Sequence, residues 1–409
     1  MTENSKYYAD AGMNFDIAIV GGAGHVGLPL AITFATKGQR VLIQDINEDA
    51  LKTIAAGRLP ALEKGADVLL PQVLKDGNLL VTSDPALVEN AATVVITIGT
   101  PVDEFLDPVH KAVKQCIDEL SPNLRDGQFI VMRSTVFPGT TDWLNNYFKQ
   151  IGKDLLLAFC PERVVQGLSI DELQNMPQIV SGTTEEAAKR AHALFSKLTD
   201  ETIELTPLEA ELAKLFNNSY RYISFAITNQ FYMMANSAGA DYHRIMDAMT
   251  RNYPRAKDMA KPGFSAGPCL FKDTMQLAAF APDQFNLGRA AMLVNEGIVL
   301  YIIDRLKQRY DLADMTVGLL GMAFKPNSDD IRASLSYKLK KHLVIACRDV
   351  LTTDPLVSVD DELEPLNIVV KKSDVLILCV PHSDYKNLDT GGKTVIDIWD
   401  FLEDGVNVF

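Results

Sequence analysis

The stretch that decides the fold is IAIVGGAGHVGLPLAITFATKGQRVLIQDI, residues 17–46. A short β-branched run leads into Gly22, Gly24 and Gly27, spaced as G-x-G-x-x-G, and a helical pattern follows at once. In such a turn the first glycine permits the tight bend, the second lets the backbone approach a pyrophosphate, and the third lets the helix pack closely. Val26 belongs to the same turn, where the helix N-terminus directs its positive end at phosphates. The stretch predicts a dinucleotide-binding βαβ unit.

A carboxylate at the end of the second strand run specifies the dinucleotide. Asp45 stands eighteen residues after Gly27. A carboxylate in that place accepts hydrogen bonds from both ribose hydroxyls and repels a 2′-phosphate, so we expect NAD rather than NADP. The other interpretation of the same residues is a structural glycine turn followed by a strand-end aspartate, with no ligand.

The order of strand-like and helix-like segments predicts an α/β protein with two Rossmann-like, doubly wound domains joined by a central long-helix segment. Residues 14–204 alternate β-branched runs with amphipathic stretches, which is typical of a parallel sheet covered by helices. Residues 205–310 contain two long periodic stretches, apolar on more than one face, which we expect to form a dimerisation and catalytic segment. Strand runs return over 311–409, the second α/β domain.

The composition excludes several classes of protein. The 409 residues are 47% apolar and 22% charged, with a formal net charge of -14, so there is no basic surplus for nucleic acid. The N-terminal segment lacks the apolar core of a signal peptide, and no run reaches membrane-spanning length. The five cysteines are far apart, odd in number and without paired metal-ligand spacing: Cys116, Cys160, Cys269, Cys347 and Cys379. We expect a cytoplasmic protein with no metal and no membrane partner.

The candidate chemistry centres on GPCLFKD, residues 267–273, where a thiol stands among turn-forming and charged residues. Nearby cations favour a nucleophilic thiolate at Cys269. Lys214 and Asn218, four residues apart on one helical stretch, form a donor pair for a developing oxyanion. Asp273, one helical turn after the thiol, is suited to position or deprotonate water. Each residue also has a structural interpretation: an inert buried cysteine, a solvated helix stripe, a charged loop.

Together these motifs resemble the nucleotide-sugar 6-dehydrogenases, the UDP-glucose/GDP-mannose dehydrogenase family. The resemblance extends from about residue 15 to 400, with the motifs in the family's order. They are the glycine motif at 22–27, IGTP at 98–101, STV at 134–136, PER at 161–163, AELAKLFNNS at 210–219, Cys-x-x-Lys-Asp at 269–273, GMAFKPNSDDIRAS at 321–334 and DP at 354–355.

The resemblance implies a two-step, four-electron oxidation of the C6 alcohol of a UDP-sugar to a uronic acid, with NAD as the hydride acceptor in both steps. Cys269 would attack the intermediate aldehyde and later carry the thioester. Lys214 and Asn218 would stabilise the oxyanion, and Asp273 would assist hydrolysis.

Further residues are implied by position in the same motifs. Thr135 and Glu162 would place water and substrate, and the C-terminal domain would hold the UDP group. We expect a homodimer or higher homo-oligomer, in which one basic residue would reach the neighbouring subunit's site. The remaining implied contacts are Thr100, Lys272 and Arg332 with NAD, Lys325, Phe264 and Gly267 with the substrate, and Arg255 with the neighbouring site.

Two departures from the family's common pattern concern the substrate. The UDP-glucose branch has a second glutamate four residues after the one in PE, and here Gln166 stands there. The run PERVVQGLSIDEL instead resembles the branch that oxidises UDP-N-acetylhexosamines of the ManNAc or GlcNAc type. Pro268 immediately precedes the thiol in SAGPCLF, residues 265–271, which removes one backbone N–H and fixes φ there.

Three alternatives stay open from the sequence. The substrate could be UDP-glucose or GDP-mannose. The reaction could be the single-step oxidation of a β-hydroxyacid, which needs a lysine but no thiol. The chain could also bind NAD without catalysis.

Overall fold

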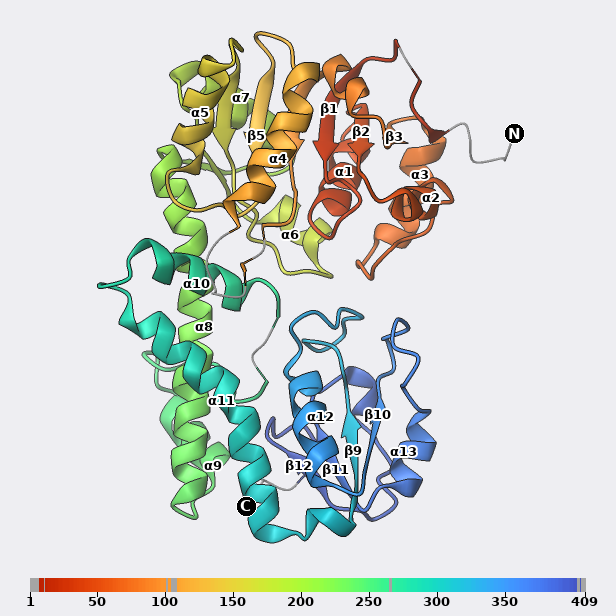
Figure 1. Ribbon diagram of the computed structural model, residues 1–409, viewed down its shortest axis with the longest axis vertical. Helices are drawn as coiled ribbons and strands as arrows, with labels where there is room; N and C mark the ends of the chain where they lie inside the picture. The colour runs from red at the N-terminus through yellow and green to blue at the C-terminus, as the bar shows by residue number, and fades with distance from the viewer. Residues whose placement is uncertain are drawn as a thin grey trace. The chain divides into compact units, whose positions relative to one another are not determined.

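The structure is a computed structural model that describes residues 7–10, 12–100, 102–103, 109–264, 267–402 and 405 (Figure 1). The chain divides into two compact units, Met1–Phe216 and Asn217–Phe409. The boundary falls inside the 31-residue helix α8 (Pro207–Ser237).

The first unit is built on a six-stranded parallel sheet with the order β3-β2-β1-β4-β5-β6. Its strands are β1 (Phe15–Val20), β2 (Val41–Gln44), β3 (Leu79–Thr82), β4 (Ala91–Ile96), β5 (Phe129–Met132) and β6 (Leu156–Phe159). This is the order of a dinucleotide-binding fold, in which ligands bind at the carboxyl ends of the strands where the order reverses. Here the reversal lies between β1 and β4.

Helices cover both faces of this sheet, so its strands are buried on both sides (Figure 1). One face packs against α1 (Gly27–Thr36), α2 (Glu48–Ala55), α3 (Ala66–Lys75), α6 (Ser169–Asn175) and α7 (Glu185–Phe195). The other face packs against α4 (His110–Leu120), α5 (Thr140–Gln150) and the first turns of α8. A separate two-stranded ladder joins β7 (Gln178–Val180) to β8 (Thr202–Glu204).

The second unit contains a four-stranded parallel sheet with the order β10-β9-β11-β12. Its strands are β9 (Thr316–Leu320), β10 (Asp349–Thr353), β11 (Val375–Leu378) and β12 (Val395–Asp397). One face packs against α11 (Asn286–Arg309) and α12 (Leu335–Ala346), and the other against α13 (Leu366–Lys372). The unit also contains α9 (Tyr242–Thr250) and α10 (Leu270–Phe280). Two Rossmann-like sheets and a long central helix confirm the predicted fold class.

Within the described part of the chain, α11 alone has the length and mean hydropathy of a membrane-spanning helix. Ile298, Ile302 and Leu306 on one of its faces are fully buried in the core of the second unit. That placement is the one expected for the core helix of a folded domain.

The glycine turn after β1 is shaped by close packing. A Cβ on Gly27 would lie 2.6 Å from the Cα of Gly22 and 2.8 Å from the carbonyl oxygen of Gly21, so α1 can approach the sheet only with glycine there. A Cβ on Gly24 would meet only the Gly21 oxygen, at an ordinary 3.5 Å. Protein packing therefore explains Gly27 but leaves Gly24 to be explained by a ligand.

A carboxylate after the second strand holds the turn after the first strand, and it does so in both units. Asp45 follows β2, and its Oδ2 accepts from the N–H of Ala23 at 3.0 Å. Asp354 follows β10, and its Oδ2 accepts from the N–H groups of Met322 and Ala323 at 2.6 and 3.0 Å. Turns between parallel strands and helices leave N–H groups without ladder partners, and these carboxylates provide them.

We call each such turn, together with the carboxylate that holds it, a corner. The corner of the second unit is fully buried. The side chains of Asp354 and His382 are both inaccessible to solvent, and the Asp354 Oδ2 lies 3.1 Å from His382 Nε2. Burial alone would raise the pKa of Asp354, but hydrogen bonds from His382 and the backbone bring it down to about 2. Because this pKa is below that of an unfolded aspartate, the carboxylate stabilises the folded unit above about pH 4, and the contribution disappears as the pH falls through 2.

We predict that Gly24→Ala and Gly27→Ala separate ligand binding from folding. Gly24→Ala should leave the thermal midpoint within about 1 °C and weaken NAD at least ~10-fold, because its methyl group takes the space of the pyrophosphate. Gly27→Ala should lower the midpoint by several degrees, because the helix must shift by overpacking worth ~1–3 kcal/mol. Differential scanning fluorimetry and calorimetry check both. A Gly24→Ala protein that binds NAD like the wild type would contradict the assignment.

We also predict a pH-dependent stability of the second unit. Trp399 lies in this unit and Trp143 in the first, so a Trp143→Phe background gives a fluorescence signal from the second unit alone. Between pH 5 and pH 2 the stability advantage over an added Asp354→Asn substitution should shrink by about 2 kcal/mol. Urea midpoints at several pH values measure it. A difference that stays constant across this range argues against the ionised Asp354.

Candidate active site

The loops after β4 and β5 meet at the carboxyl edge of the first sheet. Thr100 Oγ1 donates to the carbonyl oxygen of Thr135 at 2.6 Å, and Ser134 Oγ donates to the carbonyl oxygen of Ile98 at 2.7 Å. Two residues expected from the sequence, Thr100 and Thr135, are thus brought together at this edge. The glycine turn and Asp45 follow strands of the same parallel sheet and lie at its same edge.

Glu162, in the loop after β6, is held by a buried arginine. Arg133 Nε donates to Glu162 Oε2 at 3.0 Å, and Arg133 Nη2 donates to the same oxygen. Glu162 Oε1 accepts from the N–H groups of Arg163 and Val164 at 2.7 and 2.9 Å. Four donors fill the four acceptor sites of a carboxylate. The geometry therefore suits Glu162 to hold its loop in shape.

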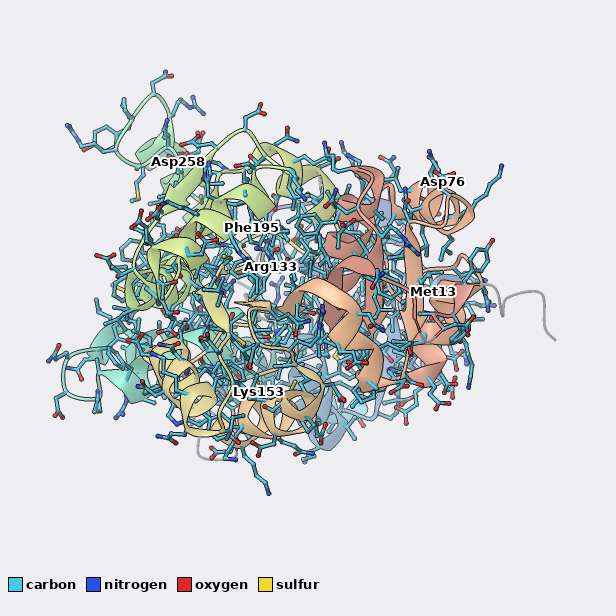
Figure 2. All side chains as sticks on the ribbon, turned by 90° about the horizontal axis from the view of Figure 1, so that it is seen from above. Met13, Asp76, Arg133, Lys153, Phe195 and Asp258 are labelled. Atoms are coloured by element: carbon cyan, nitrogen blue, oxygen red, sulfur yellow. The ribbon has the colours of Figure 1, made fainter. Side chains whose placement is uncertain are left out.

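The arginine itself is completely enclosed. Arg133 Nη1 donates to the carbonyl oxygen of Cys160, Nη2 also donates to Gln178, and the guanidinium carbon lies 4.8 Å from the ring centre of Phe195. In Figure 2 Arg133 and Phe195 lie near the middle of the view, and Asp76 of the same unit lies near its edge. Paired on every side, the buried charge fixes the β5 and β6 ends to each other.

Other contacts join the loop after β6 to the glycine turn. Gln166 Nε2 lies 3.0 Å from His25 Nδ1, and His25 stands inside the glycine motif. The carboxylate of Glu63 accepts from the N–H groups of Gly167 and Ser169 at 3.0 and 2.6 Å. The loop that carries Glu162 is therefore tied to the turn expected to bind the pyrophosphate.

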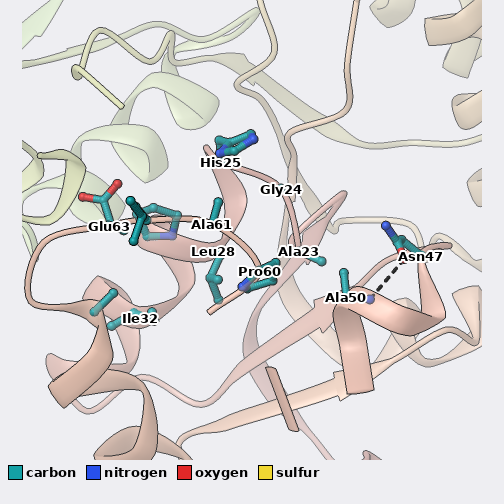
Figure 3. A pocket seen from close by; sticks show the side chains of 13 residues that line it. Ala23, Gly24, His25, Leu28, Ile32, Asn47, Ala50, Pro60, Ala61 and Glu63 are labelled. Atoms are coloured by element: carbon teal, nitrogen blue, oxygen red, sulfur yellow. Dashed lines mark hydrogen bonds between the residues drawn. The ribbon is translucent and has the colours of Figure 1, made fainter. Parts of the chain in front are cut away.

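A cavity of about 230 Å³ adjoins the glycine turn in the first unit (Figure 3). Its walls come from the turn, from α1 and from the residues before α3, and they are largely apolar. Asn47 at one end already accepts from the N–H of Ala50 as the cap of α2. This cavity extends the space beside Gly24 without adding an ionic contact for a phosphate.

In the second unit, Cys269 is the exposed thiol. Cys269 is the N-terminal cap of α10, where the unpaired N–H groups of a helix stabilise a thiolate. The other four cysteines are wholly or partly buried, and burial raises their pKa values, to about 11 for Cys347 and about 12 for Cys116 and Cys160. Cys269 is therefore the candidate for a reactive thiol.

A buried carboxylate stands one turn behind the thiol. Asp273 is inaccessible to solvent, its N–H donates to the carbonyl oxygen of Cys269, and its Oδ2 accepts from Asn218 Nδ2 at 2.6 Å. Lys272 Nζ forms an ion pair with Asp273 Oδ1 at 3.2 Å without the geometry of a hydrogen bond. Asp273 thus contacts Cys269 through its backbone and Asn218 and Lys272 through its carboxylate.

Arg332 lies within electrostatic range of the thiol. Its guanidinium binds both carboxylate oxygens of Asp330, at 2.9 Å and 3.0 Å from Nε. The hydrogen bond to Asp330 raises the pKa of Arg332, and the nearby Cys269 adds to the shift. A Cβ on Gly267 would lie 2.7 Å from the Phe324 ring, and Gly267 has a φ of +115°, so only glycine fits there.

The remaining predicted residues lie as follows. Lys214 is half-buried and one turn before Asn218 in α8, and Phe264 is buried in the core of the second unit. The ammonium group of Lys325 lies 5.9 Å from the ring centre of Phe324. Arg255 is exposed and donates to the hydroxyl of Tyr253 at 2.8 Å. Ser265 and Ala266 of the SAGPCLF run lie outside the described residues.

Sequence reasoning missed three positioning residues, Arg133, His25 and His382. Arg133 immediately precedes the STV motif, and an arginine at the end of an apolar strand is a signal that a buried acidic partner is needed. His25 is visible as the one imidazole in the glycine motif, but its partner is 141 residues away. Among the described residues, no three His, Cys, Asp or Glu side chains gather as a metal site.

Comparison with known proteins gives three family matches in chain order. Residues 15–199 match the NAD binding domain of the UDP-glucose/GDP-mannose dehydrogenase family, residues 208–297 its central domain, and residues 318–404 its UDP binding domain. The UDP-N-acetyl-D-mannosamine dehydrogenase of Pyrococcus horikoshii is 29% identical over 394 residues, which cover 93% of each chain. The NDP-N-acetyl-D-galactosaminuronic acid dehydrogenase of Ralstonia nicotianae is 28% identical, over 94% of this chain and 96% of the relative.

Solved structures agree with these matches. The UDP-D-ManNAc dehydrogenase of Pyrococcus horikoshii superposes with a TM-score of 0.87 at 27% identity, and 96% of each chain is covered. The UDP-N-acetyl-mannosamine dehydrogenase of Staphylococcus aureus superposes with a TM-score of 0.85 at 26% identity, over 96% of this chain and 97% of the other. Since all three domain models match in order from residue 15 to 404, the chain belongs to the UDP-glucose/GDP-mannose dehydrogenase family of NAD-dependent oxidoreductases.

Proposed function

We propose that this enzyme oxidises the C6 alcohol of a UDP-N-acetylhexosamine to the uronic acid, through a covalent intermediate on Cys269. The observation that carries the proposal is the exposed Cys269 at the N-terminus of α10, one turn from a buried Asp273 that is paired with Asn218 and Lys272. A thiol needs these neighbours only if it reacts.

The proposed chemistry has two oxidations and one hydrolysis. Bound NAD accepts a hydride from C6 at each oxidation. First the alcohol loses a hydride and its hydroxyl proton, which gives the aldehyde. The Cys269 sulfur then bonds to C6, and the former carbonyl oxygen becomes the oxyanion that Lys214 and Asn218 stabilise. Loss of the second hydride leaves a thioester, and water, oriented by Asp273, replaces the sulfur to give the carboxylate and the free thiol.

The first unit fits the cofactor by its own geometry. Gly24 leaves room beside the turn that protein packing does not require, and we assign the ribose to the Asp45 carboxylate, which follows β2. Thr100, Thr135 and Val26 surround the same edge, and we assign Lys272 and Arg332 to the cofactor as well. Glu162, fixed by Arg133, keeps the loop after β6 in place beside them.

The preference for an N-acetylated sugar rests on relatives and on one residue. The relatives named above are dehydrogenases of UDP-N-acetyl-D-mannosamine and of an NDP-N-acetyl-D-galactosaminuronic acid. Gln166 replaces the second glutamate of the UDP-glucose branch and contacts His25. We assign the sugar contacts to Phe264, Gly267 and Lys325, and the UDP group to the carboxyl edge of the second sheet.

We predict two NADH for each sugar oxidised, with at least one UDP-N-acetylhexosamine from a panel of UDP-sugars and GDP-mannose. Cys269→Ser should abolish acid formation, because an alkoxide bound to C6 would give an ester that does not turn over. Absorbance at 340 nm and mass spectrometry of the product measure both. Cys347→Ser, which changes a partly buried thiol away from α10, is the matched control and should stay active.

Each other outcome selects a different function. One NADH per substrate with a stable carbonyl product, unaffected by Cys269→Ser, would indicate a single-step β-hydroxyacid dehydrogenase. Faster oxidation of UDP-glucose or GDP-mannose would move the substrate assignment within the family. NAD binding without turnover on the whole panel would overturn the proposal.

We further propose that the enzyme is a homodimer that associates through α8. Tyr220, Ile227, Phe231 and Met234 are exposed by 73%, 46%, 41% and 63% and repeat at spacings of seven, four and three residues. That spacing places them on one side of the helix, as in a helix–helix interface. Arg255 is exposed and would then reach the neighbouring site.

We predict that Phe231→Glu converts the protein to a monomer, because a buried charge at the centre of an apolar helix interface is unfavourable. Light scattering after size-exclusion chromatography gives the mass. Ile345→Glu on α12, which changes a residue 88% exposed, is the matched control and should keep the wild-type mass. A wild-type protein of single-chain mass would refute the dimer and leave the proposed reaction untouched.

We also propose a cytoplasmic location, because five free cysteines are typical of a reducing compartment.

A further inference from the structure

The loop that follows β9, residues 321–334, carries Lys325 and Arg332 and has a strained backbone. Asn327 and Ala333 have φ values of +54° and +53°, which non-glycine residues rarely adopt. Such strain persists only where surrounding contacts enforce it. At Asn327 one such contact comes from a histidine outside the loop.

His382, in the loop after β11, bonds to the backbone of Asn327. The Asn327 N–H donates to His382 Nδ1 at 3.1 Å, so Nδ1 acts as an acceptor and carries no proton. The other ring nitrogen, Nε2, therefore carries the proton and donates to Asp354 Oδ2 at 3.1 Å. This assigns His382 as a neutral imidazole in one tautomer, with one donor and one acceptor both used.

The contact is reciprocal. Asn327 Oδ1 accepts from the N–H and the hydroxyl of Ser383 at 3.0 and 2.9 Å. Asp354, which orients the imidazole, also accepts from Met322 and Ala323 at the start of the same loop. The Asp354–His382–Asn327 chain therefore joins the loops after β9, β10 and β11 at the point where the strand order of the second sheet reverses.

We propose that His382 is a positioning residue, which holds the 321–334 loop in the conformation that presents Lys325 to the nucleotide-sugar and Arg332 to NAD. The inference rests on the proposed function, since that gives each of the two cations its ligand. Lys325 is two residues from Asn327, whose backbone N–H is bound by His382. Phe324, next to it, donates its N–H to the carbonyl oxygen of Asp330, which in turn binds the Arg332 guanidinium. Release of Asn327 thus alters the support of both cations.

The alternative is that this buried network only stabilises the fold. Two substitutions distinguish the positioning role from the structural role. A glutamine at position 382 can supply one hydrogen-bond donor and one acceptor, whereas a leucine supplies neither. Both substitutions alter packing against Tyr385, whose ring centre lies 5.7 Å from that of His382. A purely structural role predicts that functional losses follow stability, whatever the side chain.

The experiment compares His382→Leu, His382→Gln and Val395→Ala in the full chain. Val395 is a buried core residue of β12 that is not part of the Asp354–His382–Asn327 chain, so its truncation controls for lost stability. Hydrogen exchange of peptides from 321–334, calorimetry with UDP, and KM for the UDP-sugar are measured for each variant. His382→Leu should speed exchange in this loop and raise both KM and the Kd for UDP about tenfold, as for the loss of buried hydrogen bonds.

His382→Gln should stay within about threefold of the wild type in exchange, KM and Kd. Val395→Ala should lower the urea midpoint without changing any of them. The inference is overturned if His382→Leu behaves like Val395→Ala, or if its loop exchanges faster while UDP affinity and KM stay unchanged. If His382→Leu does not fold, Asn327→Gly keeps the positive φ, removes only the contacts to Ser383, and should raise the Kd for UDP several-fold.

The two proposals fail separately. If the wild type oxidises no nucleotide-sugar, the proposed function is wrong, and UDP calorimetry with loop exchange still decides the role of His382. If the wild type does turn over while His382→Leu binds UDP normally, only the positioning role is wrong.

Discussion

The architecture depends on how a parallel sheet satisfies the backbone N–H groups of the turns at its carboxyl edge. These groups have left the strand ladder and point into the place where a ligand binds. In both units a carboxylate one strand away accepts them, Asp45 in the first and Asp354 in the second. Only a turn fixed in this way can present glycine, threonine or lysine at a defined position. Each unit thus has a corner of the same kind at the carboxyl edge of its own sheet.

The two corners differ in how much hydrogen-bonding capacity their carboxylates keep free for a ligand. Asp45 Oδ1 accepts from the exposed Asn47 N–H and its carboxylate stays partly open, so it can also meet a ribose. Asp354 is saturated by backbone donors and an imidazole and is closed to solvent. Asp45 therefore keeps acceptor capacity for the proposed ribose contact, whereas Asp354 supports the loops around it. Lys272 and Arg332, the two cations proposed for the cofactor, each form an ion pair with a carboxylate, Asp273 and Asp330.

The fold could be predicted from the sequence, and the candidate reacting residues could be selected from it, because their signals are local. The glycine spacing, Asp45, and the four-residue spacings of Lys214 with Asn218 and of Cys269 with Asp273 each lie within one or two elements. The supports could not be predicted, since their partners are distant: Arg133 and Glu162 are 29 residues apart, Asp354 and His382 are 28, and Asn218 and Asp273 are 55. A single sequence does not show which residues of separate loops contact each other. The sequence predicts that Glu162 places water and substrate, and its four hydrogen bonds show in addition that it holds the loop after β6.

The five cysteines differ in their exposure to solvent, and this difference predicts which of them is oxidised first. Peroxides and electrophiles react with thiolates that solvent can reach, first to a sulfenic acid and then irreversibly to higher oxides. Four thiols are protected by the packing around them, and Cys269 is not. Oxidative damage will therefore begin at the residue on which the proposed chemistry depends, and the molecule will lose activity long before it loses its shape.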